Sequence, residues 1–462
     1  MTHDQTPEAL FETPAEFSGK LRLLAEAGGP IRPGGAVLLR GEGLPPGLRL
    51  RLTRGATSLH EGALSVDDAG ALLFRFRLPE RAAVGTHILA LLAEAPPSVR
   101  LLDLRISPDL PALGAERFAV SSGVLSPGPY QAAWSAKSRA LFVATASLGR
   151  PGSGADPVSA LLRLNPETLE IQAQASTPQA PLPPETAAML RRSGPTPVAV
   201  FGLGIDEARG RVWATNTLHD TVAVYAQDGL ESVKQFTPGL LRHPREVVVD
   251  AARGRAYVSG SASNEIGVFD AEALEPLTTI RISPARREGG FIPMGLALDA
   301  ARGRLFAVSR VLPEIAEIDL ETNRLTRLLP LPGLRNAAGL AYDASRNRLL
   351  VAAQESDDLT ALDAESGAMI FRTPVGAGAL SLTVDPSSGV AWVACRESGT
   401  LAGVDPQGAV VANFDVGGHP NHVVADGEGS VFAVIKTRGP EDAQGERIVR
   451  ARAVNPTPPP LN

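Results

Sequence analysis

The sequence predicts an all-β protein, and two observations support this prediction. Short apolar runs recur along the chain and are bounded by Gly, Pro, Asn and Asp, which is the pattern of strands joined by tight turns. The 462 residues include 46 Gly and 39 Pro, which suits a chain with many turns. The one helical candidate that stands out, PETAAMLRR at residues 184–192, is short, with Glu early and Arg late as the helix dipole prefers.

A repeat organises most of the chain. The stretch from Phe291 to Asp319 contains three apolar runs, with a Gly-bearing turn between the first two, and the first and third runs end on Asp. A degenerate copy near the start of the repeat region has Ser135 in the place of the first Asp. Six further copies are separated by 44, 49, 44, 42 and 41 residues, with their first Asp at Asp206, Asp250, Asp299, Asp343, Asp385 and Asp426.

A period of about 40 to 50 residues carrying three or four short strands is typical of a β-propeller. One small sheet cannot bury both of its faces, so each sheet stacks on its neighbours and the last one meets the first. Seven copies therefore predict a seven-bladed propeller over residues 115–455. The last copy has only three clear strands, so we expect residues 117–121 to pair with it and close the ring, which removes two exposed sheet edges.

The repeated Asp residues have a structural interpretation. Each lies just past the end of a strand, where a carboxylate can accept hydrogen bonds from turn N–H groups. A second Asp follows the first by 20 residues in four copies, at Asp270, Asp319, Asp363 and Asp405. We expect these side chains to be turn caps and not catalytic groups.

The copies resemble the YVTN repeat of seven-bladed bacterial propellers of the YncE type. The matching positions are an Asp, a Gly four residues later, two apolar residues and a final apolar–Asp pair, and they fall at Asp299, Gly303, Leu305, Phe306 and Ile318-Asp319, with equivalents in neighbouring copies. The resemblance covers residues 117–455. It implies the fold; proteins with this repeat include periplasmic and surface binding proteins, and related propellers are lactonases, lyases and redox subunits. Fold alone does not choose among these functions.

The N-terminal part differs from the rest. Residues 1–19 are expected to form a flexible arm, and residues 20–110 contain short alternating strands that predict a small β-sandwich. Pro33–Gly47 and Asp68–His87 resemble bacterial immunoglobulin-like modules of the IPT/TIG sort, which are usually spacers or partner-docking surfaces. Residues 107–114 read as a linker, and residues 456–462 as a flexible tail.

Composition limits the classes of partner. The formal net charge of −6 argues against nucleic acid, whose phosphates are bound by an excess of Lys and Arg. No apolar run is long enough to span a membrane. The N-terminal residues lack a signal-peptide pattern, so a cytoplasmic protein and an exported one are both open, and the resemblance favours a periplasmic or extracellular location. We expect the protein to be a monomer. Any association with the cell envelope would be through a partner. The single Cys395 is expected to be a buried hydrophobic residue.

In a propeller, the loops that precede the inner strands and the loops between second and third strands meet around one mouth of the central channel. The side chains in these loops are mostly basic or polar, and we expect them to bind a small anionic ligand or a protein partner. The predicted ligand-binding residues are Tyr130, His219, His243, Arg245, Arg310, Arg335, Asn336, Arg396, His419, Asn421, His422 and Lys436. Three longer loops, residues 148–157, 174–196 and 439–448, are either functional or surface decoration.

His243, His419 and His422 invite a metal interpretation, but two His separated by two residues on an extended chain point to different faces. We therefore expect structural roles for them, no metal and no cofactor. No haem, nucleophile-elbow or phosphate-loop motif is present. The predicted function is that of a non-enzymatic binding protein. The alternatives are a lactonase-like hydrolase or lyase with a metal in the channel, and a pure protein–protein scaffold.

Overall fold

The computed structural model describes residues 18–93, 95, 97–147, 156–285, 289–439, 442 and 444–454. The chain divides into two units, Met1–Asp109 and Leu110–Asn462. The predicted N-terminal arm up to residue 17, the predicted tail, and the greater part of the predicted loop at 148–157 lie outside the described residues, as do residues 440, 441 and 443 of the third loop.

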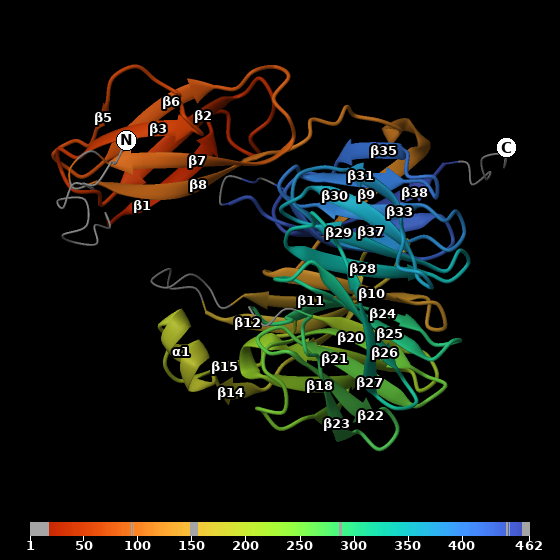
Figure 1. Ribbon diagram of the computed structural model, residues 1–462. Helices are drawn as coiled ribbons and strands as arrows, with labels where there is room; N and C mark the ends of the chain where they lie inside the picture. Colours follow the sequence, from red (N-terminus) through yellow and green to blue (C-terminus); the bar gives the residue numbers. More distant parts are fainter. Residues whose placement is uncertain are drawn as a thin grey trace. The chain divides into compact units, whose positions relative to one another are not determined.

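The first unit is a β-sandwich (Figure 1). One sheet has the order β1-β2-β6 and the other has the order β4-β3-β7-β8, with β5 also paired to β3. Alternate apolar residues of both sheets, such as Val37 and Leu39 in one and Leu50 and Leu52 in the other, enter a single core. The immunoglobulin-like character of this unit stays a prediction. The strands are β1 (Lys20–Ala25), β2 (Ala36–Glu42), β3 (Arg49–Arg54), β4 (Thr57–Ser58), β5 (Leu64–Ser65), β6 (Leu72–Arg77), β7 (Gly85–Ala93) and β8 (Ser98–Ile106).

In the described part of the second unit, seven antiparallel sheets of four strands form the blades of a propeller, as predicted. Blade 1 is β10 (Pro129–Ser135), β11 (Ala140–Ser147), β12 (Val158–Leu164) and β13 (Ile171–Ser176). Blade 2 is β16 (Leu203–Asp206), β17 (Arg211–Asn216), β18 (Thr221–Ala226) and β19 (Ser232–Gln235). Blade 3 is β20 (Pro244–Asp250), β21 (Arg255–Gly260), β22 (Glu265–Asp270) and β23 (Glu275–Arg281). Blade 4 is β24 (Pro293–Asp299), β25 (Arg304–Ser309), β26 (Glu314–Asp319) and β27 (Arg324–Pro330).

Blade 5 is β28 (Ala337–Asp343), β29 (Arg348–Ala353), β30 (Asp358–Asp363) and β31 (Met369–Pro374). Blade 6 is β32 (Ala379–Val384), β33 (Ala391–Cys395), β34 (Thr400–Val404) and β35 (Val410–Asp415). Blade 7 is β36 (His419–Ala425), β37 (Ser430–Lys436), β38 (Arg447–Ala453) and β9 (Phe118–Val124). Between blades 1 and 2 the insertion forms a hairpin of β14 (Gln179–Pro181) and β15 (Pro195–Pro197), with the predicted helix α1 (Pro184–Leu190) between the two strands.

The first strands of the blades form a closed ring around the channel. Each of β10, β16, β20, β24, β28, β32 and β36 contacts the next in this order, and β36 contacts β10. Closure rests on β9, which comes from the start of the unit and pairs along its whole length with β38 of the last blade. The prediction that residues 117–121 complete the last blade is therefore confirmed.

The repeated Asp side chains cap turns, as predicted. Asp250 accepts hydrogen bonds from the N–H groups of Ala252 and Arg253, and Asp270 accepts them from Glu272 and Ala273. The other copies repeat this arrangement. Because Asp250 is fully buried, its carboxylate also has to be paired, and Arg253 supplies the charge.

The same turns join neighbouring blades. The guanidinium of Arg209 in blade 2 contacts Asp206 and reaches Glu272 in blade 3 at 2.6 Å. One blade further on, Arg253 contacts Glu321 of blade 4 at 2.8 Å. A carboxylate, the Arg three residues later and an acidic residue of the next blade thus form a recurring ionic link between blades.

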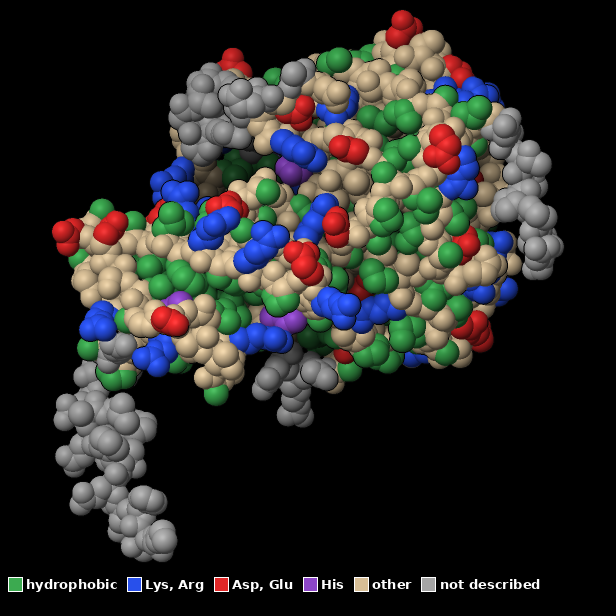
Figure 2. Space-filling view, turned by 90° about the horizontal axis from the view of Figure 1, so that it is seen from above, with side chains coloured by type: hydrophobic (Ala, Val, Ile, Leu, Met, Phe, Trp, Pro, Cys, Tyr) green, Lys and Arg blue, Asp and Glu red, His purple; other side chains and the backbone are tan. Residues whose placement is uncertain are grey.

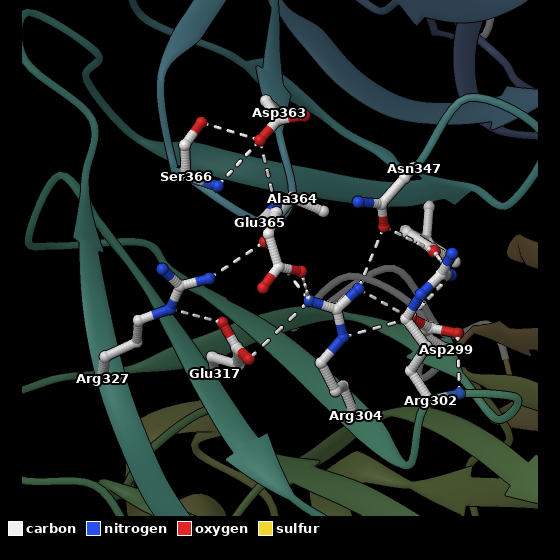
Figure 3. Close-up of polar contacts among 11 residues, drawn as sticks. Asp299, Arg302, Arg304, Glu317, Arg327, Asn347, Asp363, Ala364, Glu365 and Ser366 are labelled. Atoms are coloured by element: carbon white, nitrogen blue, oxygen red, sulfur yellow. Dashed lines mark hydrogen bonds and ion pairs between the residues drawn. The ribbon is translucent and has the colours of Figure 1, made fainter.

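The link between blades 4 and 5 is the most extensive of these (Figure 3). Arg304 donates two hydrogen bonds to Asp299 of its own blade, at 3.1 and 2.8 Å, and one to Asn347 of blade 5 at 3.0 Å. It also pairs with Glu365 of blade 5. The side chains of Arg304 and Asp299 are 10% and 2% exposed, so this pair is shielded from water. Arg302 contacts the same carboxylate from a side chain that is 50% exposed.

Because Arg304 is buried and Arg302 is half-exposed, substitutions at these two positions should lower the free energy of unfolding by different amounts. Arg304→Met leaves Asp299 and Asn347 without their buried partner and should lower the free energy of unfolding by about 3 kcal/mol. Arg302→Met removes a half-exposed contact and should cost less than about 1 kcal/mol. Urea unfolding of both variants measures the two values, and equal losses would contradict the assigned role of Arg304.

Candidate functional site

The candidate site lies where the inner strands begin. Six of these strands carry a register shift near their first residues, for example between Pro129 and Ala132 in β10 and between Pro244 and Val247 in β20. Such a bulge leaves residues unpaired and turns their side chains away from the regular alternation. The residues at the bulges line a cavity in the channel, and its polar members are Tyr130, Gln131, Arg245, Glu246, Ser381, Asn421 and His422.

Five side chains from four blades converge at this end of the channel, and we call them the mouth cluster: Tyr130, Arg245, Arg396, Asn421 and Lys436. Arg245 donates a hydrogen bond to the Tyr130 hydroxyl, and the ammonium of Lys436 lies 4.7 Å from the centre of the Tyr130 ring. Arg396, in the loop after β33, donates to the side-chain oxygen of Asn421. The Asn421 amide in turn donates to the Tyr130 carbonyl at 2.7 Å.

No ion pair or hydrogen bond joins the three cations of the mouth cluster to a carboxylate within the part of the chain that the structure describes. All three side chains are half-buried. Elsewhere basic and acidic side chains are interspersed, as on the face drawn in Figure 2. Three half-buried cations without a directly bonded carboxylate make this end of the channel locally positive, and Glu246 and Glu446 offset this charge only in part.

Burial and neighbouring charge shift the pKa values of two cations of the cluster. Burial, and then the nearby charge of Arg396, lowers the pKa of Lys436 to about 8, although the carboxylate of Glu446 opposes the shift. Burial also lowers the pKa of Arg396, and the charge of Arg245 adds to this effect. The environment of Lys436 and Arg396 therefore disfavours their positive charge, and either the loss of a proton or the binding of an anion would relieve this.

Two titratable groups lie deeper in the cavity. Burial raises the pKa of Glu246 to about 7, against the opposing effects of a hydrogen bond from Gln131 (3.0 Å) and the charge of Arg245. Burial also lowers the pKa of His422 to about 4, so its ring is neutral at pH 7. The His422 Nδ1 accepts a hydrogen bond from the Ala132 N–H at 3.4 Å, which puts the ring proton on Nε2 as a donor.

The structure brings together part of the predicted set. Tyr130, Arg245, Arg396, Asn421 and Lys436 form the mouth cluster, and His422 lines the cavity below it. His419 lies beside the cluster, with its Nδ1 3.0 Å from the Arg396 carbonyl oxygen. Whether these residues bind a ligand stays a prediction.

Five predicted residues do not join the cluster. His219 is fully buried and its ring contacts Thr196 of the insertion hairpin at 3.2 Å, so its predicted place at the channel mouth is corrected. The insertion, which the repeat does not contain, covers this position. The remaining four have local roles or point to solvent: His243 bonds Asp220 through its N–H, Arg335 and Asn336 contact Glu355, and the side chain of Arg310 is exposed.

The sequence analysis did not select Gln131 or Glu246 as site residues. Both residues occupy the same position of the repeat as His422, two residues after the Pro near the start of the inner strand. This shared position was a signal in the sequence that could have identified them. Gln131 is fixed from two sides because its side-chain oxygen accepts from the Leu203 N–H at 3.0 Å while its amide donates to Glu246.

Neither a metal-binding cluster nor a membrane-crossing helix occurs among the described residues. No three His, Cys, Asp or Glu side chains gather closely enough to hold a metal ion, and His243, His419 and His422 each have separate partners. No described helix has the length and apolar character needed to cross a membrane. Cys395 is buried, as predicted, and burial raises its pKa to about 12.

Similar folds occur among solved structures, although no family model and no curated protein matches the sequence. A catalytically inactive virginiamycin B lyase from Staphylococcus aureus, solved with quinupristin, has 12% identity and a TM-score of 0.56 over 73% of this chain and 100% of the lyase chain. Hydrazine synthase from Kuenenia stuttgartiensis has 15% identity and a TM-score of 0.55 over 71% of this chain and 97% of its own. A streptogramin B lyase has 13% identity and a TM-score of 0.55, over 73% and 98% of the two chains. The fold is a β-propeller. At these identities the likeness shows the fold alone.

The electrostatics of the mouth cluster can be tested without a ligand. Replacing Arg396 by Gln removes a charge that lowers the pKa of Lys436, so that pKa should rise from its value of about 8. The chain has four lysines, so an NMR titration of labelled lysine side chains can follow Lys436 individually. Arg310→Gln, at an exposed arginine in blade 4, is the control and should leave the pKa unchanged. An unchanged pKa in Arg396→Gln would mean that the two groups are not neighbours.

Proposed function

We propose that the protein is a non-enzymatic binding protein whose propeller takes a small anion at the channel mouth. The observation that carries this proposal is the convergence of Arg245, Arg396 and Lys436 around Tyr130 with no carboxylate among their described partners. The chain as a whole has a net charge of −6, so the cluster is a local reversal of sign. A cationic recess on an anionic body concentrates small anions from solution.

The chemistry of the cluster suits an oxyanion. Arg245 and Arg396 can each present two parallel N–H groups, the geometry that carboxylate, sulfate and phosphate oxygens accept. The Asn421 amide and the Nε2–H of His422 add neutral donors in the wall of the cavity. An anion here would neutralise part of the mutual repulsion that lowers the pKa of Lys436, and this gain would support binding.

The size of the cavity limits the ligand. Its volume is about 50 Å³, far below the roughly 300–1,000 Å³ of sites that enclose drug-sized ligands. The proposed ligand is therefore a small ion, or the anionic end of a molecule whose remainder stays outside. An exported location, periplasmic or extracellular, belongs to the proposal because the repeats resemble those of exported binding proteins.

One observation favours a second candidate function, that of a propeller lyase or hydrolase. Glu246 lines the cavity with a pKa of about 7, which suits a general base at neutral pH. Two of the similar structures are lyases. Turnover of a substrate that Glu246→Gln abolishes would favour this function over simple binding.

A different observation favours a protein partner. On the outer face of the first unit, Ile88, Val99 and Leu101 are 48%, 59% and 65% exposed. They lie close together because β7 and β8 pair Leu92 with Val99 and Ala90 with Leu101. An apolar patch of this kind is typical of a docking surface, so a scaffold role for this unit remains compatible with anion binding by the propeller.

Removing two charges of the mouth cluster tests the main proposal. The unaltered protein should bind sulfate saturably in isothermal titration calorimetry, and Arg245→Gln/Arg396→Gln should weaken this binding by about tenfold or more. Sulfate also stabilises folded proteins by exclusion from their surface, so melting temperatures alone would mislead. The matched control is Arg191→Gln/Arg310→Gln, which removes two exposed arginines. Sulfate binding that survives in the first variant would refute the proposal.

The pH dependence of sulfate affinity gives an independent test, because sulfate keeps its charge across the relevant range. An adjacent anion raises the pKa of Lys436 above its free value of about 8 and that of Glu246 above about 7. Affinity should therefore be full below pH 7 and fall as the pH rises through 7 and then through 8. Glu246→Gln should remove the first part of the decline and keep the second. A flat profile between pH 6 and 9 would show that neither group senses the anion.

A further inference from the structure

The wall of the channel cavity is divided by chemical character. Following the ring, blades 7, 1 and 3 contribute polar side chains, among them Tyr130, Arg245 and Asn421. Blades 4, 5 and 6, on the other arc, contribute only small or apolar residues and one serine: Gly295, Ala338, Gly339, Leu340, Leu380, Ser381 and Leu382. The division follows the order of the inner strands, β24, β28 and β32 being consecutive neighbours.

The apolar arc offers few groups to an anion. Ala338 and Leu380 are 6% and 7% exposed, and neither is part of the large hydrophobic clusters between blades. The Ser381 hydroxyl already accepts a hydrogen bond from the Val423 N–H at 3.3 Å. Gly295 has no side chain because a Cβ there would lie 2.7 Å from the Ala338 carbonyl oxygen of the next strand. The strands of this arc approach closely and leave a narrow, largely apolar wall.

The polar arc has the opposite character. Arg245 lines the cavity and is linked to Tyr130, and Asn421 lines it and is linked to Arg396. The Nε2–H of His422 is a further donor on the same side. A ligand in this cavity therefore meets Arg245, neutral donors and the carboxyl group of Glu246 on one side and a largely apolar wall on the other.

We propose that the ligand of this site is a short aliphatic monocarboxylate, with its carboxylate against Arg245 and Asn421 and its alkyl chain against Ala338 and Leu380. This inference rests on the proposed function, and it names the chemical class of the anion. A symmetrical inorganic anion would turn some of its oxygens toward a wall whose lining offers one side-chain donor, the Ser381 hydroxyl, and this costs solvation. A dicarboxylate would place its second charge there. A volume of about 50 Å³ leaves no room for a ring or a long chain inside the cavity.

The test is a series of affinities measured by calorimetry on the full chain at pH 6, with formate, acetate, propionate, butyrate, succinate and sulfate. If the alkyl chain is buried against the apolar arc, affinity should rise about fourfold per added methylene until the cavity is full. Succinate should bind more weakly than propionate, and sulfate more weakly than acetate.

A variant of the apolar arc separates this inference from the proposed function. Leu380→Asn should remove the gain per methylene without weakening sulfate binding, since its amide adds a donor to the apolar arc, and Ala338→Ser is a milder replacement should Leu380→Asn fail to fold. Equal affinities for formate and propionate, or sulfate binding tighter than every carboxylate, would overturn the carboxylate inference and leave anion binding intact. If no anion in the series binds, the proposed function fails and the inference fails with it.

Discussion

The pairing of β9 with β38 is the contact on which the channel depends. It joins the first strand of the propeller unit to its last blade, so that β10 and β36 become neighbours in the ring. The mouth cluster straddles this junction, because the Asn421 side chain of blade 7 bonds the Tyr130 carbonyl of blade 1. Sheets that stack in an open row would keep their cores and their turn caps, but Tyr130 and Asn421 would no longer meet. Ring closure is thus both a source of stability and the origin of the candidate site.

Charged side chains are paired with opposite charges at the contacts between blades but not at the channel mouth. Between blades, Arg304 and Asp299 are paired at 2.8 Å and each retains further partners, so the buried charges are compensated within the protein (Figure 3). At the channel mouth, Arg245, Arg396 and Lys436 surround a tyrosine with no ion pair to a carboxylate among the described residues. Because a half-buried cation without an ion-pair partner is unfavourable, three of them at one point of a regular scaffold are consistent with the proposed binding of an external anion.

The candidate site could be predicted in part. Tyr130, Arg245 and Asn421 precede or open inner strands, and the geometry of a propeller brings such positions to one mouth whatever the sequence between them. His219 was misplaced because a hairpin insertion specific to one blade covers it, and no periodic signal foretells what an insertion packs against. Arg335 was likewise predicted to face the ligand but pairs with Glu355 on its own blade.

The sequence by itself determined the number of blades, the turn caps and the strand that closes the ring, because each follows from contacts that are local or repeat with a fixed period. Asp250 caps its turn with N–H groups two and three residues away, and a pattern in the chain suffices to reveal it. Only the tertiary structure decided which basic side chains converge and that one arc of the cavity is apolar. Those properties arise between blades far apart in the sequence, where bulges at the strand starts and the reach of each side chain set the neighbours, and no local rule fixes them.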